Sequence, residues 1–175
     1  MAFFRPKTIK GVIYDLAHLD PFSFELPLAD KKWSIRVQFH CHCFTEALAA
    51  HHTPDLRYQH DRETRAFDFQ RYDLSHQLPN LIRTLGSRSV YLSSQINYFT
   101  LRQDAHPQHP GPYLVFFNVH KLERRSEDVL MMIESAYIKP NMADRASPVK
   151  FTTLIEKTAS GEKVPRGAPQ LIKRK

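Results

Sequence analysis

The densest group of reactive side chains is a run in which two histidines alternate with two cysteines: His40, Cys41, His42 and Cys43. Zinc prefers imidazole and thiolate ligands, about four of them, at ~2.0–2.3 Å in a tetrahedron. Alternate side chains of a strand point to opposite faces, so a strand here would separate the thiols from the imidazoles. We therefore predict no metal at this run. His40 and His42 joined by His51 or His52 remain the open alternative.

The same geometry bears on the two thiols. Cys41 and Cys43 would share one face of the strand with their Cα atoms ~6.5–7 Å apart, at or beyond the limit for a disulfide. The odd positions of the segment are apolar, and a thiol among them behaves as a small hydrophobe. We predict two reduced, buried thiols, as is usual in a reducing compartment.

A second group of chemically useful side chains depends on how three predicted strands are ordered. Residues 96–102, 112–120 and 129–139 have connections too short for parallel crossovers, so they should form an antiparallel meander. One edge of that meander then collects the following residues: Arg102, His106, His109, Tyr113, Ser135, Tyr137 and Lys139. Ordinary exposure at strand ends is the competing interpretation of this group.

A third group precedes the predicted helix at residues 78–86. Arg71 and Tyr72 could bind a phosphate and a base of a nucleic acid. Tyr72 could equally be a core ring whose hydroxyl reaches the surface.

The sequence pattern around these groups predicts an α+β fold with a mainly antiparallel sheet. Strands are expected near residues 33–44, 96–102, 112–120 and 129–139, and the 112–120 and 129–139 strands should be central because they are apolar on both faces. Helices are expected near 46–52, 78–86 and 148–159, and a helical spacing also runs weakly through the first twenty residues. Residues 1–160 should form one domain, followed by a flexible tail at 161–175.

The order strand, helix and three antiparallel strands resembles the RelE-type toxin fold within a wider group of barnase-like ribonucleases. The resemblance covers roughly residues 33–139, and it departs from the compact family at the insertion 45–73 and the helix after Ser147. It implies a basic sheet edge with a tyrosine or histidine for proton transfer, to which Arg102, Tyr137 and Lys139 could correspond. The chain is also similar to uncharacterised proteins of bacterial mobile elements, which imply no activity.

These observations lead to a functional hypothesis, a toxin-like or RNA-processing ribonuclease that needs no metal or cofactor. RNA cleavage requires a base, an acid and cations for the phosphate. Arg102, Tyr137, Lys139 and His42 are the expected catalytic residues, and the expected substrate-binding residues are Arg71, Tyr72, Ser135, His106 and His109. An inhibitory protein would accompany a toxin. The alternative is a non-catalytic adaptor for nucleic acid or protein.

Charge and composition favour an anionic partner and exclude several classes. The formal net charge is +7, of which residues 161–175 carry +4. There is no G-x-S-x-G elbow and no glycine-rich phosphate loop, which argues against hydrolases of that type and nucleotide-binding folds. No apolar run approaches the ~20 residues of a membrane helix, so we expect a cytoplasmic protein.

Overall fold

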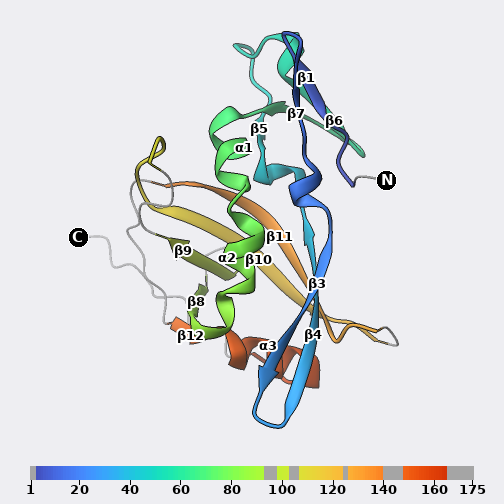
Figure 1. The fold of residues 1–175 in the computed structure, drawn as a ribbon, viewed down its shortest axis with the longest axis vertical. Coiled ribbons are helices and arrows are strands. Elements are labelled where there is room, and N and C mark those ends of the chain that lie inside the picture. The colour runs from blue at the N-terminus through green and yellow to red at the C-terminus, as the bar shows by residue number, and fades with distance from the viewer. Residues whose placement is uncertain (1–2, 93–97, 103–106, 124–125, 140–147, 165–175) are drawn as a thin grey trace, which may run out of the picture.

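The computed structural model describes residues 3–92, 98–102, 107–123, 126–139 and 148–164. Its main sheet has seven strands in the order β12-β8-β9-β10-β11-β4-β3 (Figure 1). Their bounds are β3 (Phe22–Leu28), β4 (Lys31–Phe39), β8 (Ser89–Leu92), β9 (Tyr98–Arg102), β10 (Tyr113–Lys121), β11 (Val129–Ile138) and β12 (Pro148–Lys150). Only the β4–β11 pairing among these strands is parallel. The α+β class with a mainly antiparallel sheet is confirmed.

The centre of this sheet is the meander expected from the sequence. β10 pairs with β9 on one side and β11 on the other, both antiparallel, and Tyr113 lies opposite Arg102 and Ile138. Leu114 and Val115 point to opposite faces of β10 and are both buried. Burial on both faces explains why this strand is apolar throughout and lies in the middle.

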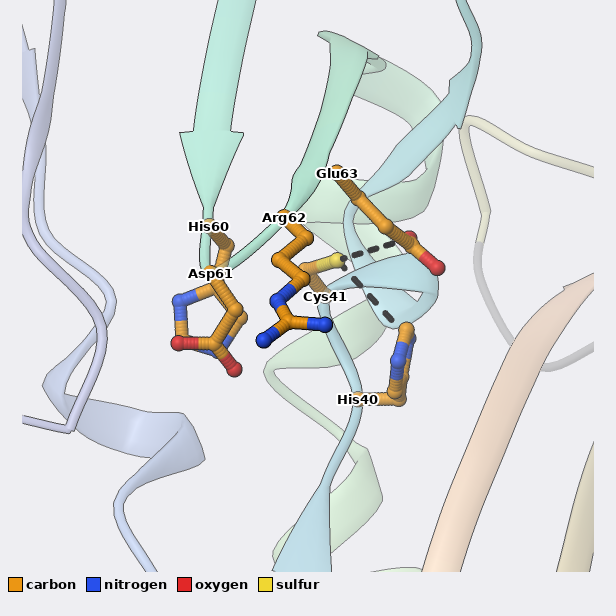
Figure 2. A pocket seen from close by; sticks show the side chains of 6 residues that line it. All are labelled: His40, Cys41, His60, Asp61, Arg62 and Glu63. Carbon is orange, nitrogen blue, oxygen red and sulfur yellow. Dashed lines mark hydrogen bonds and ion pairs between the residues drawn. The ribbon is translucent and has the colours of Figure 1, made fainter.

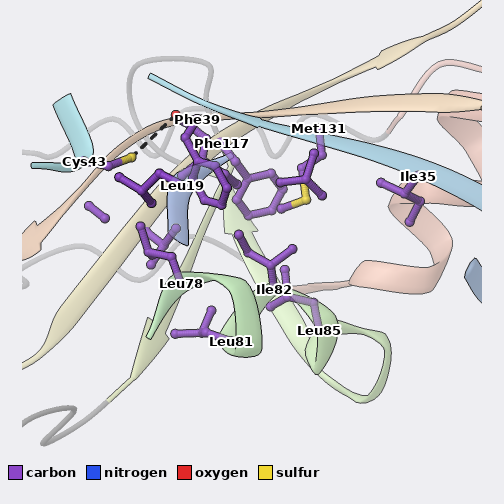
Figure 3. Close-up of a cluster of buried hydrophobic side chains, with 14 of the residues drawn as sticks. Leu19, Ile35, Phe39, Cys43, Leu78, Leu81, Ile82, Leu85, Phe117 and Met131 are labelled. Carbon is purple, nitrogen blue, oxygen red and sulfur yellow. Dashed lines mark hydrogen bonds between the residues drawn. The ribbon is translucent and has the colours of Figure 1, made fainter. Parts of the chain in front are cut away.

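Three helices within the described residues cover the sheet: α1 (Phe69–Ser75), α2 (Leu78–Arg83) and α3 (Phe151–Ser160). Asp68 caps α1, since its side chain accepts a hydrogen bond from the backbone N–H of Arg71 at 3.1 Å. Leu78 and Ile82 of α2 are fully buried against sheet residues such as Phe117 (Figure 3). Gly161 ends α3 with a left-handed φ of +76°.

A smaller layer lies at one end of the molecule, beyond α1 (Figure 1). Three strands form a sheet in the order β5-β7-β6, with bounds Thr45–Ala47, Glu63–Phe67 and Arg57–His60 respectively. A hairpin of β1 (Lys7–Ile9) and β2 (Val12–Tyr14) accompanies it. His60 pairs with Glu63, so a two-residue turn of Asp61 and Arg62 joins β6 to β7, and Asp61 takes a left-handed φ of +50°.

Three predicted helical segments differ from the structure. The helix at 46–52 is wrong, because Thr45–Ala47 pairs with β7 as a strand. The weak helix in the first twenty residues is also wrong, since Ile9 pairs with Val12 across a turn at Gly11, whose φ is +81°. The helix at 148–159 begins later, at Phe151, because residues 148–150 pair with β8.

Two predicted strands contain an interruption in the structure. The strand at 33–44 ends at Phe39, and a single 3-10 turn, η2 (Cys41–Cys43), follows it. In β11 the register shifts, so that Phe116 lies opposite Ser135 but Phe117 opposite Ile133. The additional residue at this bulge is Glu134. After the bulge the buried side chain that follows Ile133 is Ala136, whereas Ser135 is only half-buried.

The predicted tail begins with ordered contacts. The backbone N–H of Glu162 donates to the carbonyl of Lys157 at 2.8 Å, and Val164 packs against the core. The remainder of the tail, residues 165–175, lies outside the described residues. None of the described helices combines the length and apolar character needed to cross a membrane.

Candidate metal centre

The turn after β4 redirects the side chains of the histidine–cysteine run. The N–H of His40 donates to the carbonyl of Ile133 at 2.8 Å, which holds the end of β4 on the central sheet. The N–H groups of Cys43 and Phe44 then bond the carbonyls of His40 and Cys41, at 3.1 and 3.2 Å, and close the 3-10 turn. In this turn the strand's alternation is lost, so the separation of Cys41 from both histidines is wrong.

The turn brings four potential metal ligands together: His40, Cys41, His42 and Glu63. Their ligand atoms all lie within 4.8 Å of one another. Cys41 Sγ is 3.7 Å from His40 Nδ1 and 3.9 Å from Glu63 Oε2. Dashed lines in Figure 2 mark these two contacts. The two-residue turn between β6 and β7 delivers Glu63, which also lies 2.9 Å from His42 Nε2.

These separations are close to those that a tetrahedral ion requires. With bonds of ~2.0–2.3 Å, neighbouring ligand atoms stand about 3.3–3.8 Å apart. Of the three distances in the cluster, 3.7 Å lies within that range, 2.9 Å is shorter and 3.9 Å is slightly longer. Small rotations of the side chains would therefore suffice to close the cluster around one ion.

A surrounding set of hydrogen bonds fixes the turn. Thr45 Oγ1 donates to the carbonyl of Cys41 at 2.7 Å and accepts from Arg65 Nε at 2.8 Å. Arg71 Nη1 donates to the carbonyls of His42 and Thr45, at 3.1 and 2.8 Å. Such bonds orient ligands before an ion arrives, which reduces the entropy lost on binding.

The protonation states of three ligands follow from burial and neighbours. Burial, reinforced by the Glu63 carboxylate, raises the pKa of the Cys41 thiol to about 11. Burial lowers the pKa of His42, and the hydrogen bond from His42 lowers the pKa of Glu63. At neutral pH these groups are therefore a thiol, a neutral imidazole and a carboxylate. An ion would deprotonate the thiol.

A cavity of about 640 Å³ opens onto the cluster. Its lining residues, drawn in Figure 2, are His40, Cys41, His60, Asp61, Arg62 and Glu63. The cluster is thus reachable from solvent on one side, although Cys41 itself is only 1% exposed.

A second group of ligand types, Glu46 with His51 and His52, does not suit a metal. The N–H of Ala49 donates to His52 Nδ1 at 2.8 Å, so that nitrogen carries no proton. The proton of the neutral ring is then on Nε2, which lies 2.9 Å from Glu46. Both ring nitrogens of His52 are therefore occupied. Among the described residues, His51 and His52 cluster with Glu46 and not with His40 and His42.

Ser75 of α1 lies beside His18, but this pair is not arranged to activate the serine as a nucleophile. Ser75 Oγ donates its single proton to the carbonyl of Tyr72 at 2.6 Å, so His18 Nε2, 2.7 Å away, must donate to Ser75. Burial and the adjacent His76 lower the pKa of His18 to about 4, which keeps the ring neutral. Because Nε2 already carries the ring's proton, this nitrogen cannot accept the serine proton.

The structure brings together three of the predicted site residues. Arg71 contacts the His42 carbonyl, and its guanidinium carbon lies 5.0 Å from the ring centroid of Tyr137. Tyr137 also stacks on Phe116 at 5.4 Å. Since Arg71 directs Nη1 to backbone carbonyls and pairs with Asp68 at 3.4 Å, its observed role is structural.

The other predicted residues have separate surroundings. Tyr72 is a packed ring whose hydroxyl donates to the Asp15 carbonyl, and His109 lies 3.1 Å from Asp73. Lys139 is exposed just beyond β11, and Ser135 is half-buried opposite Phe116. The backbone of Arg102 pairs with Tyr113 as expected, but its side chain and the whole of His106 lie outside the described residues.

Cys41 and Glu63 are partners of the two histidines that the sequence pattern does not predict. To place Glu63 near residues 40–42 from the sequence, one would have to predict the hairpin that turns at Asp61 and Arg62. The turn lacks Asn-Gly or Asp-Gly, which are the strongest hairpin signals.

Comparison with known proteins gives one match. The family model described as the YjaZ family matches residues 6–159, a range that includes all four potential ligands. No curated protein and no solved structure matches the chain. These comparisons do not link the chain to RelE-type toxins, and the family description states no activity.

Proposed function

The chain belongs to the YjaZ family, and for this member we propose a metal-binding function, with one zinc-type ion held by His40, Cys41, His42 and Glu63. The observation that carries the proposal is the convergence of four ligand atoms within 4.8 Å. Two of these residues, His42 and Glu63, already lie side by side, joined by a 2.9 Å hydrogen bond that an ion would replace.

The types of ligand favour zinc over other common ions. Calcium and magnesium prefer oxygen ligands alone, whereas two imidazoles, a thiolate and a carboxylate suit the borderline-soft Zn²⁺. The ligands come from two elements, the turn after β4 and the start of β7. An ion would therefore join the main sheet to the smaller sheet.

The test is cobalt binding by the full-length protein, because Co²⁺ bound to a thiolate absorbs in the near ultraviolet. The wild type should show this band with one ion per chain. His42→Ala should weaken binding by more than about 100-fold, beyond what second-layer changes cost. The matched control is His51→Ala, an exposed histidine of the other group. Equal affinity in the two variants would refute the proposal.

A metal-independent ribonuclease, as in RelE-type toxins, is the second candidate. The 2.9 Å His42–Glu63 pair supports it, since this pair could exchange a proton, and Arg71 connects His42 to Tyr137. Purified protein incubated with RNA in EDTA, beside Tyr137→Phe, separates the candidates. Cleavage that survives EDTA and is lost in the variant favours the ribonuclease.

A non-catalytic adaptor is the remaining proposal, supported by charge alone. Residues 165–175 contain four of the basic side chains of the tail: Arg166, Lys173, Arg174 and Lys175. Deleting them should weaken RNA binding and flatten its salt dependence, by a slope of about 0.7 per lost contact on single strands. Both the ribonuclease and the adaptor proposals place the protein in the reducing cytoplasm. Both also include an inhibitory or regulatory protein partner.

A further inference from the structure

The cluster is open on the side of the cavity. Three of its four residues, His40, Cys41 and Glu63, line the 640 Å³ cavity. Structural zinc sites are closed by four protein ligands, whereas sites that bind a substrate retain a position for water or another ligand. An ion here would face the cavity rather than the protein interior.

Glu63 is the ligand that an incoming molecule could replace. Its side chain is 48% exposed and lies directly after the β6–β7 turn. The other three ligands are consecutive in one turn, whose backbone is held by Thr45 and Arg71. Three fixed ligands are enough to retain zinc in sites that exchange the fourth.

The cavity also presents a positive side chain beside that replaceable ligand. Arg62 precedes Glu63 and lines the same cavity, as Figure 2 shows. Asp61, the acidic residue that precedes Arg62, pairs with His60 at 3.7 Å. Arg62 forms no ion pair with any residue in the described part of the chain. An arginine side chain without an ion-pair partner can donate two parallel hydrogen bonds to the oxygen atoms of a phosphate group.

The charges near the loaded site favour an anion. The two positive charges of the ion would be balanced by the Cys41 thiolate and the Glu63 carboxylate. Arg62 and the half-buried Arg65, whose charge acts on both of those groups, then outnumber Asp61, the remaining carboxylate of the cavity lining. Replacing Glu63 by a phosphate group keeps the ion neutralised and also satisfies Arg62.

We propose that this cavity is a phosphate-binding site, in which a phosphate or phosphate ester takes the coordination position of Glu63 and bonds Arg62. The inference rests on the proposed metal-binding function. The ligand class is a phosphate oxyanion, whether free or esterified.

The experiment uses the full-length protein loaded with Co²⁺, whose visible bands respond to a changed ligand. Inorganic phosphate, phenyl phosphate, dimethyl phosphate and acetate are titrated separately. Phosphate or the phosphate esters should shift the bands, and Arg62→Gln should weaken that response by about ten-fold while leaving Co²⁺ affinity unchanged. Arg57→Gln, an exposed arginine of β6 outside the cavity lining, is the matched control.

The outcomes separate this inference from the metal proposal. A thiolate–cobalt band that no phosphate compound perturbs overturns the inference and leaves the metal centre standing. Loss of the thiolate–cobalt band from the wild type overturns both. An acetate response equal to the phosphate response overturns the ligand class, and an unchanged phosphate response in Arg62→Gln overturns the role of Arg62.

Discussion

Arg71 Nη1 donates a hydrogen bond to the carbonyl oxygen of His42 at 3.1 Å, which connects helix α1 to the turn carrying three potential metal ligands. The same nitrogen bonds the carbonyl of Thr45 at 2.8 Å. Because Asp68 caps α1 and also pairs with Arg71, the helix start and the ligand turn are held by one side chain.

Arg71→Ala should lower the free energy of unfolding by about 2 kcal/mol or more, because two carbonyls lose a charged donor. Metal affinity should fall as well, since the turn would no longer be fixed. Urea denaturation and cobalt titration measure the two effects. Arg57→Ala, at an exposed arginine, should change neither. A full-affinity Arg71→Ala protein would show that the turn holds its shape without α1.

Metal binding near pH 8 should release about one proton per ion. The pKa of Cys41 is raised to about 11, so the thiol is protonated there and must lose its proton to bind. The lowered pKa values of His42 and Glu63 mean that these two groups release none. Affinity should therefore rise about ten-fold per pH unit. Calorimetry in buffers of different ionisation enthalpy counts the protons, and a count of zero would exclude Cys41 as a ligand.

Zinc should raise the melting temperature of the protein, because an ion that joins two sheets binds only the folded chain. At free zinc about 1,000-fold above the Kd, the stabilisation is about 4 kcal/mol. For a chain of this length that corresponds to roughly 8–16 °C. Thermal scans of the wild type and Cys41→Ser with and without zinc check this. The same zinc-dependent shift in both proteins would contradict it.

Stability should decline in mild acid because of His18. Its pKa is lowered to about 4 by burial and by His76, although Asp15 and Asp20 act in the opposite direction. Between pH 6.5 and 4 the unfolded chain binds a proton at His18 that the folded chain does not. The free energy of unfolding therefore decreases as the pH is lowered, by at most about 1.4 kcal/mol per pH unit.

His18→Gln tests this assignment. It removes the titrating ring and should flatten the pH dependence of stability between pH 6.5 and 4. Chemical denaturation at several pH values gives the two slopes. Equal slopes in the wild type and the variant would attribute the acid sensitivity to other groups.

The central strands could be predicted because their constraint is local. Apolar residues on both faces were enough to identify β10 and β11, and short connections predicted their antiparallel order with β9. The parallel neighbour of β11 was not predictable in this way. Leu130 lies opposite Arg36, and local sequence patterns do not predict pairing between residues so far apart in the chain. The helix predicted at 46–52 failed for a related reason, since pairing with β7 overrides local propensity.

The candidate site depended on two departures from regular structure. The residue types of the histidine–cysteine run were recognised, but the strand pattern was extended beyond Phe39, where the 3-10 turn begins. Likewise, regular alternation along β11 would place Ile133 and Tyr137 on one face, but the bulge at Glu134 interrupts it. A turn and a bulge shift the direction of side chains by one position, and periodicity alone does not reveal either.

The parallel pairing of β4 with β11 has a consequence for the order of folding. β3 and β4 can form their hairpin as soon as residues 22–39 leave the ribosome, but the inner edge of β4 then has no partner until β11 is synthesised. During that interval an apolar strand edge is open to other chains. Folding should therefore be limited by a late, long-range closure, and chains stopped before residue 138 should aggregate or require a chaperone.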